Sequence, residues 1–309
     1  MRSVVILGST GSIGENALRV AAALPGSFRV IGLAARSKAS RVIGQAVQFG
    51  VKTVALADPA AALEAETLAK PHGIEVLSGD DGLASLASLK EADVVLCALV
   101  GLAGLKPVLA ALGADKDIAL ATKEVLVSAG ELVMGERAGR GVAILPVDSE
   151  HSAIFQALQS PVFLPACVRP LGTPPNAFAE DRVARLILTA SGGPFAGRPD
   201  VDFDRVTPQD ALNHPRWRMG PKVTIDSATM MNKGLEILEA RWLFNIPVDR
   251  IGVLVHPQSV VHSLVEFNDG TTLAELSVPD MRIPIQYALT WPDRKAVPMP
   301  PLDLAVAGG

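Results

Sequence analysis

The sequence has only two cysteines, Cys97 and Cys167, in 309 residues. Two thiols exclude a disulfide-rich scaffold and a zinc site built from four cysteines. Aromatic residues make up 4% of the chain and charged residues 19%. The mean hydropathy is +0.33, yet no apolar run reaches the roughly 18 residues that a membrane-spanning helix needs. These absences favour a soluble protein of a reducing compartment.

Neither sign of charge dominates, because 28 Lys and Arg face 32 Asp and Glu, for a net charge of −4. That balance argues against a nucleic-acid partner and against a polybasic membrane surface. The chain has no Walker loop and no G-x-S-x-G elbow. Val4–Leu7 is too short for the apolar part of a signal peptide, so we expect a cytoplasmic protein. An organellar protein after removal of its transit peptide would look the same.

Strands and helices alternate through the first half of the sequence. Short apolar runs predict buried parallel strands, and Ala- and Leu-rich helical stretches separate most of them. The predicted strands are Val4–Leu7, Val30–Ala35, Val54–Ala57, Val94–Val100, Ile118–Ala121 and Ala143–Val147. This alternation is typical of an α/β protein with a doubly wound parallel sheet, which we place at roughly residues 1–150.

A glycine-rich loop, G-S-T-G-S-I-G at residues 8–14, connects the first predicted strand to a helix. Dinucleotide-binding folds place such a loop here because glycine lets the backbone approach a pyrophosphate and the helix N-terminus offers free N–H groups. The pattern also fits an ordinary strand–helix turn, but its position favours nucleotide binding.

The end of the second predicted strand distinguishes NAD from NADP. NAD enzymes place an acidic residue there, which binds the ribose hydroxyls. This chain instead has Arg36, Ser37 and Lys38, whose two cations and one hydroxyl suit the 2′-phosphate of NADP. A solvated basic turn fits as well, and we favour NADP.

Carboxylates gather in two polar runs of the second half. Asp148 and Glu150 follow the last predicted strand, and extended chain would turn both to the same side, although a helix N-terminus fits too. Glu236 lies four residues after Asn232 and would share a helix face with it. Three oxygen donors with few histidines nearby suit Mg²⁺ or Mn²⁺ better than zinc.

Two turn-rich stretches complete this half. Ser191-Gly192-Gly193-Pro194 follows the strand-like Leu186–Thr189, and its hydroxyl and N–H groups can hold a phosphate. Residues 213–220 carry proline, glycine and a tryptophan in a loop that can serve as a mobile lid. We also expect the run Asp226–Glu236 to start a helix at Ser227 or Thr229.

Eight motifs follow one another from residue 8 to residue 285. They are G-S-T-G-S-I-G (8–14), A-T-K-E (121–124), V-D-S-E-H (147–151), S-G-G-P-F (191–195), H-P-R-W-R-M-G (214–220), D-S-A-T-M-M-N-K-G-L-E (226–236), H-P-Q-S-V-V-H-S (256–263) and P-D-M-R-I-P-I (279–285). Together they closely resemble the 1-deoxy-D-xylulose 5-phosphate reductoisomerase family. The resemblance covers nearly the whole chain and is far more specific than the glycine loop alone.

The resemblance implies a fold and an activity. Residues 1–148 would form an NADPH-binding, Rossmann-like domain, and residues 149–292 an α+β domain for catalysis, metal and substrate binding, and dimerisation. Residues 293–309 would match a linker toward the family's C-terminal helical domain, which we expect to be absent from this chain. The family rearranges 1-deoxy-D-xylulose 5-phosphate and reduces the product with NADPH to 2-C-methyl-D-erythritol 4-phosphate, in the non-mevalonate isoprenoid route. A homodimer is implied as well, and Ile251–Ala274 is our candidate interface.

The resemblance also assigns site residues. Asp148, Glu150 and Glu236 match the metal ligands, in agreement with the carboxylate argument, and they join Lys123 and His214 in the catalytic set. The residues that match the substrate pocket are Lys123, Ser149, Glu150, Ser191, His214, Trp217, Ser227, Asn232, Lys233 and Glu236. Trp217 belongs to residues 211–221, which match an active-site flap.

Cofactor contacts are implied at residues of both halves. They are Thr10, Gly11, Ser12, Ile13, Arg36, Ser37, Lys38, Thr122, Glu124 and Gly220. The family usually has Asn-Lys-Glu where this chain has Thr122-Lys123-Glu124. Because threonine lacks the separate donor and acceptor of an amide, we expect a weaker or rearranged cofactor contact at Thr122.

Two other functions fit parts of the sequence. A semialdehyde-type NADP-dependent dehydrogenase has the same layout, but it would not need three acidic ligands beside a Ser/Asn/Lys phosphate pocket. A truncated or inactive relative would bind nucleotide and dimerise without turnover, but the metal-matching carboxylates and Lys233 are intact. The sequence therefore predicts an NADPH-dependent reductoisomerase with a sugar phosphate substrate.

Overall fold

The computed structural model describes residues 1–159, 182–215, 220–296 and 299–307. These residues divide into two compact units. Unit 1 holds residues 1–148 and 281–296, and unit 2 holds residues 149–159, the described part of 182–280, and 299–307. No helix among the described residues is both long enough and apolar enough to cross a membrane.

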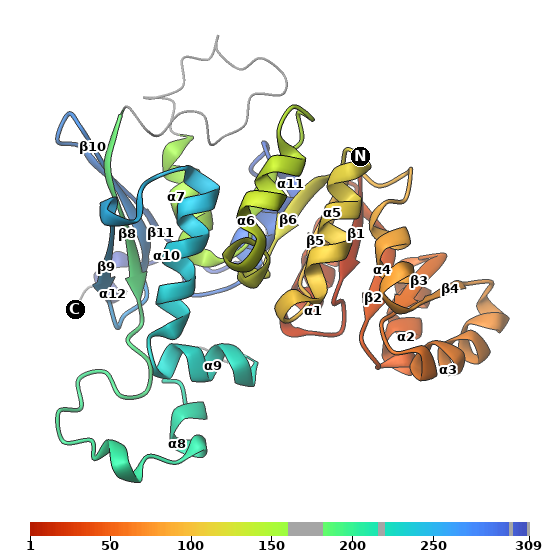
Figure 1. Ribbon diagram of the computed structural model, residues 1–309, viewed down its shortest axis with the longest axis horizontal. Helices are drawn as coiled ribbons and strands as arrows, with labels where there is room; N and C mark the ends of the chain where they lie inside the picture. The colour runs from red at the N-terminus through yellow and green to blue at the C-terminus, as the bar shows by residue number, and fades with distance from the viewer. Residues whose placement is uncertain (160–181, 216–219, 297–298, 308–309) are drawn as a thin grey trace. The chain divides into compact units, whose positions relative to one another are not determined.

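Unit 1 is built on a parallel sheet of seven strands in the order β4-β3-β2-β1-β5-β6-β7 (Figure 1). The strands are β1 (Arg2–Leu7), β2 (Phe28–Ala35), β3 (Thr53–Leu56), β4 (Glu75–Ser78), β5 (Val94–Cys97), β6 (Asp117–Leu120) and β7 (Ile144–Pro146). Val4, Val5, Ile6 and Leu7 are all completely buried, as expected for a central strand with helices on both faces.

Helices cover this sheet in two groups. They are α1 (Ser12–Ala23), α2 (Ala39–Phe49), α3 (Pro59–Ala69), α4 (Gly79–Ala87), α5 (Leu105–Gly113), α6 (Lys123–Arg137) and α11 (Arg282–Thr290). α1 packs against α11 and α2 against α3, whereas α4 packs against α5 and α5 against α6. Right-handed crossovers place one group on each face. The strand order reverses between β1 and β5, which is where such sheets bind ligands, at the carboxyl ends.

The doubly wound sheet is confirmed, with two differences in detail. The edge strand β4 was not predicted, because its residues Glu75–Ser78 are only half-buried or exposed and carry no apolar run. The predicted strand Val94–Val100 ends at Cys97, and the Val100 side chain is 77% exposed. Apolar residues beyond Cys97 therefore belong to a loop at the carboxyl end of the sheet.

Unit 2 contains a four-stranded sheet in the order β11-β10-β8-β9. Its strands are β8 (Val183–Ala190), β9 (Ile251–Val255), β10 (Val261–Phe267) and β11 (Thr272–Leu276). β10 pairs antiparallel with β8 and β11, and β8 pairs parallel with β9. The unit's helices are α7 (Ser149–Leu158), α8 (Pro208–Leu212), α9 (Pro221–Ala228), α10 (Met231–Phe244) and α12 (Leu304–Ala307). α7 packs against β10 and β11, and α10 against β8 and β9.

The helix predicted to begin at Ser227 or Thr229 begins later. α9 ends at Ala228, and Met230 adopts a left-handed conformation with φ of +61°. The Thr229 hydroxyl accepts a hydrogen bond from the Met231 N–H at 3.4 Å, at the start of α10. The prediction was wrong because the left-handed turn divides one polar run between two helices.

Residues 281–296 belong to unit 1, although residues 149–292 were predicted as one catalytic domain. Helix α11 in this segment contacts α1, β6 and β7. Its residues Pro284–Thr290 are all buried. The contact with unit 1 is a tertiary one, which periodicity along the chain does not reveal.

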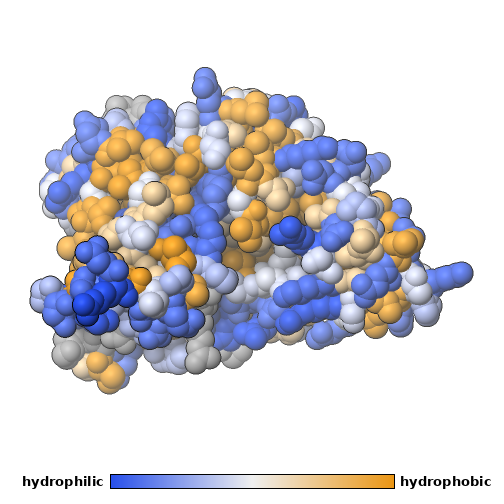
Figure 2. Space-filling model, turned by 60° about the horizontal axis from the view of Figure 1, so that its bottom comes forward, coloured by the Kyte–Doolittle hydropathy of each residue, from blue (hydrophilic) through white to orange (hydrophobic). Residues whose placement is uncertain are grey.

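Strand β9 exposes apolar side chains at the edge of its sheet. Val253, Leu254 and Val255 are 40–50% exposed, and Leu276 of β11 is 40% exposed. The three β9 residues lie within the segment Ile251–Ala274 predicted as an interface, and Leu276 lies just after it. Figure 2 shows apolar areas among polar ones on the face that it presents.

Candidate active site

The glycine loop of unit 1 is held in a tight turn after β1. Gly8 has φ of +92°, and the N–H groups of Gly8 and Ser9 both donate to Ala34 O. A Cβ at Gly14 would lie 2.3 Å from Gly8 O, so only glycine lets α1 start this close to the loop. The structure therefore has the strand–loop–helix turn that a pyrophosphate-binding loop requires.

A glutamine that sequence reasoning missed braces this loop. Ser9 Oγ donates to Gln45 Oε1 at 2.7 Å, and Gln45 Nε2 donates to Ser9 O at 3.1 Å. Gln45 lies on α2, far from the glycine motif in sequence, and no local pattern marks it. It is a structural partner of the loop.

The predicted cofactor residues of unit 1 differ in exposure. Gly11, Ser12, Arg36, Ser37 and Lys38 are exposed, and Ile13 and Glu124 are half-buried. Thr10 and Thr122 are buried. The Thr122 hydroxyl donates to Leu99 O at 2.5 Å, so this side chain is bound to the segment after β5.

A buried ion pair joins the ends of two neighbouring strands of unit 1. Lys123 follows β6 as the first residue of α6, and Asp148 follows β7. Lys123 Nζ lies 2.5 Å from Asp148 Oδ2, with side-chain exposures of 9% and 18%. Parallel strands β6 and β7 end at the same edge, which brings these two predicted site residues together.

A second buried lysine sits among carboxylates in unit 2. Lys233 on α10 is 5% exposed and donates to Glu150 Oε1 at 2.8 Å, to Glu236 Oε2, and to the main-chain oxygen of Thr189. Burial alone would lower the pKa of Lys233, but the charges and hydrogen bonds of Glu150 and Glu236 raise it above its usual value. Lys233 is therefore a permanent cation.

Glu236 is completely buried, so it is not an exposed residue on its helix, as a single glutamate usually is. It also accepts a hydrogen bond from Asn232 Nδ2, one turn earlier on α10, as their spacing predicts. The Ser149 hydroxyl donates to Glu150 in the same way at the start of α7. Both carboxylates are thus oriented by neighbours on their own helices.

The three predicted metal ligands come together at the start of α7. Asp148 precedes the helix by one residue, Glu150 lies in its first turn, and one oxygen each of Asp148, Glu150 and Glu236 lies within 4.8 Å of the others. Asp148 and Glu150 come close because α7 begins between them, and not because the chain is extended there, as we predicted. Ligands of Mg²⁺ at about 2.1 Å lie roughly 3–4 Å apart, so these oxygens fit one hard cation. The two lysines leave one negative charge uncompensated, which also favours a cation.

Predicted substrate residues of unit 2 line one small cavity. Its walls include Glu150, Ser191, Ser227, Asn232 and Lys233. Gly193 has φ of +72°, and a Cβ there would lie 2.7 Å from Ser227 O, so glycine lets the loop after β8 approach the end of α9. A lysine, an amide and two hydroxyls around one recess suit a phosphate group.

His214 reaches the same loop. Its Nε2 lies 2.9 Å from Ser191 Oγ, and partial burial lowers the pKa of His214. Gly220, before α9, is exposed. Trp217, predicted to cover the substrate, lies outside the described residues.

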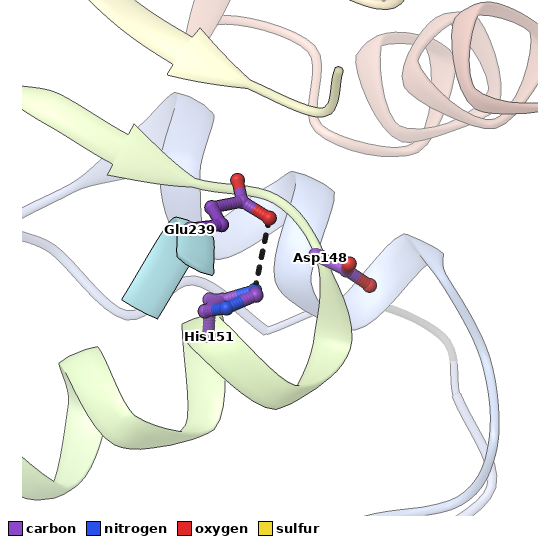
Figure 3. A group of neighbouring side chains, drawn as sticks. All are labelled: Asp148, His151 and Glu239. Carbon is purple, nitrogen blue, oxygen red and sulfur yellow. Dashed lines mark ion pairs between the residues drawn. The ribbon is translucent and has the colours of Figure 1, made fainter. Parts of the chain in front are cut away.

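Sequence reasoning missed a buried pair behind the carboxylates. His151 Nδ1 and Glu239 Oε2 are 3.3 Å apart, and the two side chains point toward each other from α7 and α10 (Figure 3). The available signal was weak: His151 follows Glu150 directly, and Glu239 lies one turn after Glu236.

Three family models match this chain. The 1-deoxy-D-xylulose 5-phosphate reductoisomerase model matches residues 4–130, and the model of that enzyme's C-terminal domain matches residues 144–244. A model described as the DXP reductoisomerase C-terminal domain matches residues 276–308, which overlap the segment predicted as a linker.

Curated relatives agree with these matches. The chain is 49% identical over 307 residues to the 1-deoxy-D-xylulose 5-phosphate reductoisomerase of Moorella thermoacetica, covering 99% of this chain and 75% of the relative. It is 51% identical over 311 residues to that of Symbiobacterium thermophilum, covering 99% and 76%. The chain thus spans about three quarters of these relatives.

Solved structures are similar as well. One is a DOX-P reductoisomerase in complex with NADPH, fosmidomycin and magnesium, with a TM-score of 0.89, 40% identity, and coverage of 99% of this chain and 73% of that chain. Another, from Zymomonas mobilis in complex with NADPH, has a TM-score of 0.87 and 40% identity, covering 100% and 75%. From its motifs, its fold and these likenesses, the chain belongs to the 1-deoxy-D-xylulose 5-phosphate reductoisomerase family.

Proposed function

We infer that this chain catalyses the NADPH-dependent conversion of 1-deoxy-D-xylulose 5-phosphate to 2-C-methyl-D-erythritol 4-phosphate. The observation that carries this function is the buried cluster of Glu150, Lys233 and Glu236, which lies inside the matched region 144–244. Such a cluster combines the hard ligands of a divalent cation with a permanent cation for an anionic substrate.

Asp148, Glu150 and Glu236 are the proposed ligands of Mg²⁺ or Mn²⁺. A bound divalent cation supplies Lewis-acid polarisation of substrate oxygens. The residues around the ligands prepare them for this role: Asn232 and Ser149 orient Glu236 and Glu150 through hydrogen bonds. Lysine ammonium groups lie at ion-pair distance from these carboxylates, and a nearby positive charge favours the charged form of a carboxylate, which is the form that binds a cation.

The cavity next to this cluster is the proposed phosphate site. Ser191, Ser227, Asn232 and Lys233 line it and supply hydroxyl, amide and ammonium donors. His214 bonds to Ser191, and its lowered pKa keeps the imidazole neutral near pH 7, so it orients a hydroxyl without adding charge. The flap, residues 211–221 with Trp217, is proposed to exclude water from the substrate.

Unit 1 is proposed to bind NADPH, which supplies the hydride. Thr10, Ser12 and Ile13 would place N–H groups of the loop and of α1 around the pyrophosphate, and Gly11, whose N–H donates to Gly8 O, would let the backbone approach it. The exposed Arg36, Ser37 and Lys38 would bind the 2′-phosphate. Glu124 and Gly220 are further proposed contacts, and Thr122 would act through its main chain because its hydroxyl is bound to Leu99.

Several properties accompany this function as proposals. A homodimer is supported by the exposed apolar residues of β9 within the candidate interface Ile251–Ala274. Mn²⁺ as an alternative to Mg²⁺, a cytoplasmic location, and a sugar phosphate substrate without a nucleic-acid or membrane partner rest on the family resemblance and the balanced charge. The alternative of a semialdehyde-type dehydrogenase is not favoured, because it leaves the carboxylate cluster without a role.

Turnover tests the function directly. Oxidation of NADPH, followed by its near-ultraviolet absorbance, should require both 1-deoxy-D-xylulose 5-phosphate and Mg²⁺ or Mn²⁺. A folded chain that binds NADPH and the cation but does not turn over would favour the alternative of an inactive relative. Turnover without any divalent cation would contradict the ligand assignment.

A further inference from the structure

Ser9, in the glycine loop of unit 1, is hydrogen-bonded to two separate elements. It is 0% exposed. Its N–H donates to Ala34 O at 2.8 Å, near the end of β2. Its hydroxyl donates to Gln45 Oε1 at 2.7 Å, and its main-chain oxygen accepts from Gln45 Nε2 at 3.1 Å. Because Gln45 lies on α2, Ser9 contacts both ends of the segment from Ala34 to Gln45.

The two hydrogen bonds fix the orientation of the Gln45 amide. A carbonyl oxygen only accepts hydrogen bonds, so the amide nitrogen faces Ser9 O. The amide oxygen then faces the Ser9 hydroxyl and accepts from it. Both polar ends of the amide are thus engaged by a residue without exposed surface. This arrangement gives Gln45 a role in placing the loop and not in touching a ligand.

The segment between the two contacts of Ser9 contains the exposed turn Arg36–Lys38, the proposed site of the 2′-phosphate. This turn joins β2 to α2. Its main chain is bonded on both sides, because the Asp58 N–H donates to Arg36 O and the Val42 N–H donates to Lys38 O. The position of the turn therefore follows the end of β2 and the start of α2.

The two proposed phosphate sites of unit 1 belong to one ligand. NADPH carries its pyrophosphate and its 2′-phosphate on the same adenosine, within a limited range of distances. Two linked groups strengthen each other's binding only where the geometry lets both engage at once. NADH lacks the 2′-phosphate, so its binding depends on the loop and not on the distance from the loop to the turn.

We propose that Gln45 is a positioning residue, which sets the distance between the glycine loop and the turn Arg36–Lys38 and thereby the preference for NADPH over NADH. This inference rests on the proposed function in that it takes unit 1 as the NADPH-binding unit. Arg41 of α2 also pairs with Glu15 of α1 at 2.5 Å, but these side chains are 53% and 28% exposed. An exposed ion pair is a weak tie, so the Gln45 amide is the firmer connection from α2 to the loop region.

The Gln45→Met variant removes both hydrogen bonds to Ser9 and keeps a side chain of similar length. The dissociation constants of NADPH and NADH are measured by cofactor fluorescence, without substrate. We expect the constant of NADPH to rise about tenfold and that of NADH by less than about threefold, because the charge-assisted contacts of the 2′-phosphate depend on its placement. Ser9→Ala removes one of the two hydrogen bonds and should reduce the preference for NADPH by less.

Ile43→Val is the matched control. Ile43 is also buried on α2, at 5% exposed. Loss of a methyl group there lowers the melting temperature but removes no hydrogen bond of Ser9. The ratio of the NADH constant to the NADPH constant should stay at the wild-type value in this variant. An equal fall of the ratio in Ile43→Val would reduce Gln45 to a residue of general stability.

The ratio of the two constants separates positioning from a general disturbance of the loop. Equal changes of both constants, or no change, in a folded Gln45→Met overturn the positioning role. If that variant does not fold, a wild-type ratio in Ser9→Ala overturns it. The titrations do not depend on turnover, so the two proposals fail separately. A wild-type chain that prefers NADPH but does not turn over 1-deoxy-D-xylulose 5-phosphate contradicts the proposed function alone.

Discussion

Replacing Lys233 with methionine removes the buried ammonium that lies between Glu150 and Glu236 while keeping a side chain of similar length. The two carboxylates, 16% and 0% exposed at their side chains, then face each other without that charge. Removing one partner of a buried ion pair costs about 3–5 kcal/mol. For a domain of about 150–250 residues, each kcal/mol corresponds to a shift of about 2–4 °C, so the melting temperature of a unit of that size should fall by about 6–20 °C.

The loss should depend on the cation, because a bound Mg²⁺ replaces part of the missing positive charge. We therefore expect Mg²⁺ to raise the melting temperature of Lys233→Met by more than that of the wild type, measured by circular dichroism. Lys222→Met is the control, since its pair with Asp226 is partly exposed at 43% and 16% and should contribute about 1 kcal/mol or less. A Lys233→Met chain that melts at the wild-type temperature, or equally with and without Mg²⁺, would refute the account of the cluster.

Three further predictions concern separate parts of the chain. Gly14→Ala should weaken NADPH binding at least tenfold, because its Cβ would lie 2.3 Å from Gly8 O. Gly44→Ala on α2 is the control and should leave NADPH binding unchanged, because a Cβ there meets nothing within 4 Å. Equal NADPH affinities of the two variants by fluorescence titration would speak against the loop assignment. The pKa of His214 lies below its usual 6.5, so the imidazole is mostly neutral above pH 6.5, and kcat/KM should fall only at lower pH. His214→Asn should abolish this loss of activity at low pH. If the loss persists in the variant, it belongs to another group. Burial raises the pKa of Cys97 to about 11, so the thiol should not react with iodoacetamide at pH 8 in the folded chain. Peptide mass spectrometry should find Cys97 alkylated only after unfolding in guanidinium. Alkylation of Cys97 in the folded chain would contradict this burial.

Much of unit 1 could be predicted because its helices cover both faces of the sheet. Burial on both faces makes strands such as Val4–Leu7 wholly apolar, and that pattern is visible in the sequence. The edge strand Glu75–Ser78 escaped prediction because it has one neighbour and no apolar run. Residues 281–296 escaped because their contact with unit 1 depends on tertiary packing.

The residues of the candidate site were also predicted only in part. Asp148, Glu150, Glu236 and Lys233 were predicted from residue type and motif, and the structure brings the carboxylates and Lys233 together with the charges that such chemistry needs. Glu239 was missed because a single glutamate three residues after Glu236 looks like an ordinary helix residue. Only the approach of α7 to α10 reveals its contact with His151.

The exchange Asp148→Asn tests most directly the claim that three carboxylates hold the catalytic cation. Titration of Mn²⁺ and of NADPH against the wild type and the variant separates the two binding events. Asp115→Asn is the control, since Asp115 is 67% exposed at its side chain and its left-handed φ of +58° suits asparagine. The account predicts that Asp148→Asn weakens Mn²⁺ binding at least tenfold and leaves NADPH affinity unchanged. Unchanged Mn²⁺ binding, or a large loss of NADPH affinity, would contradict it.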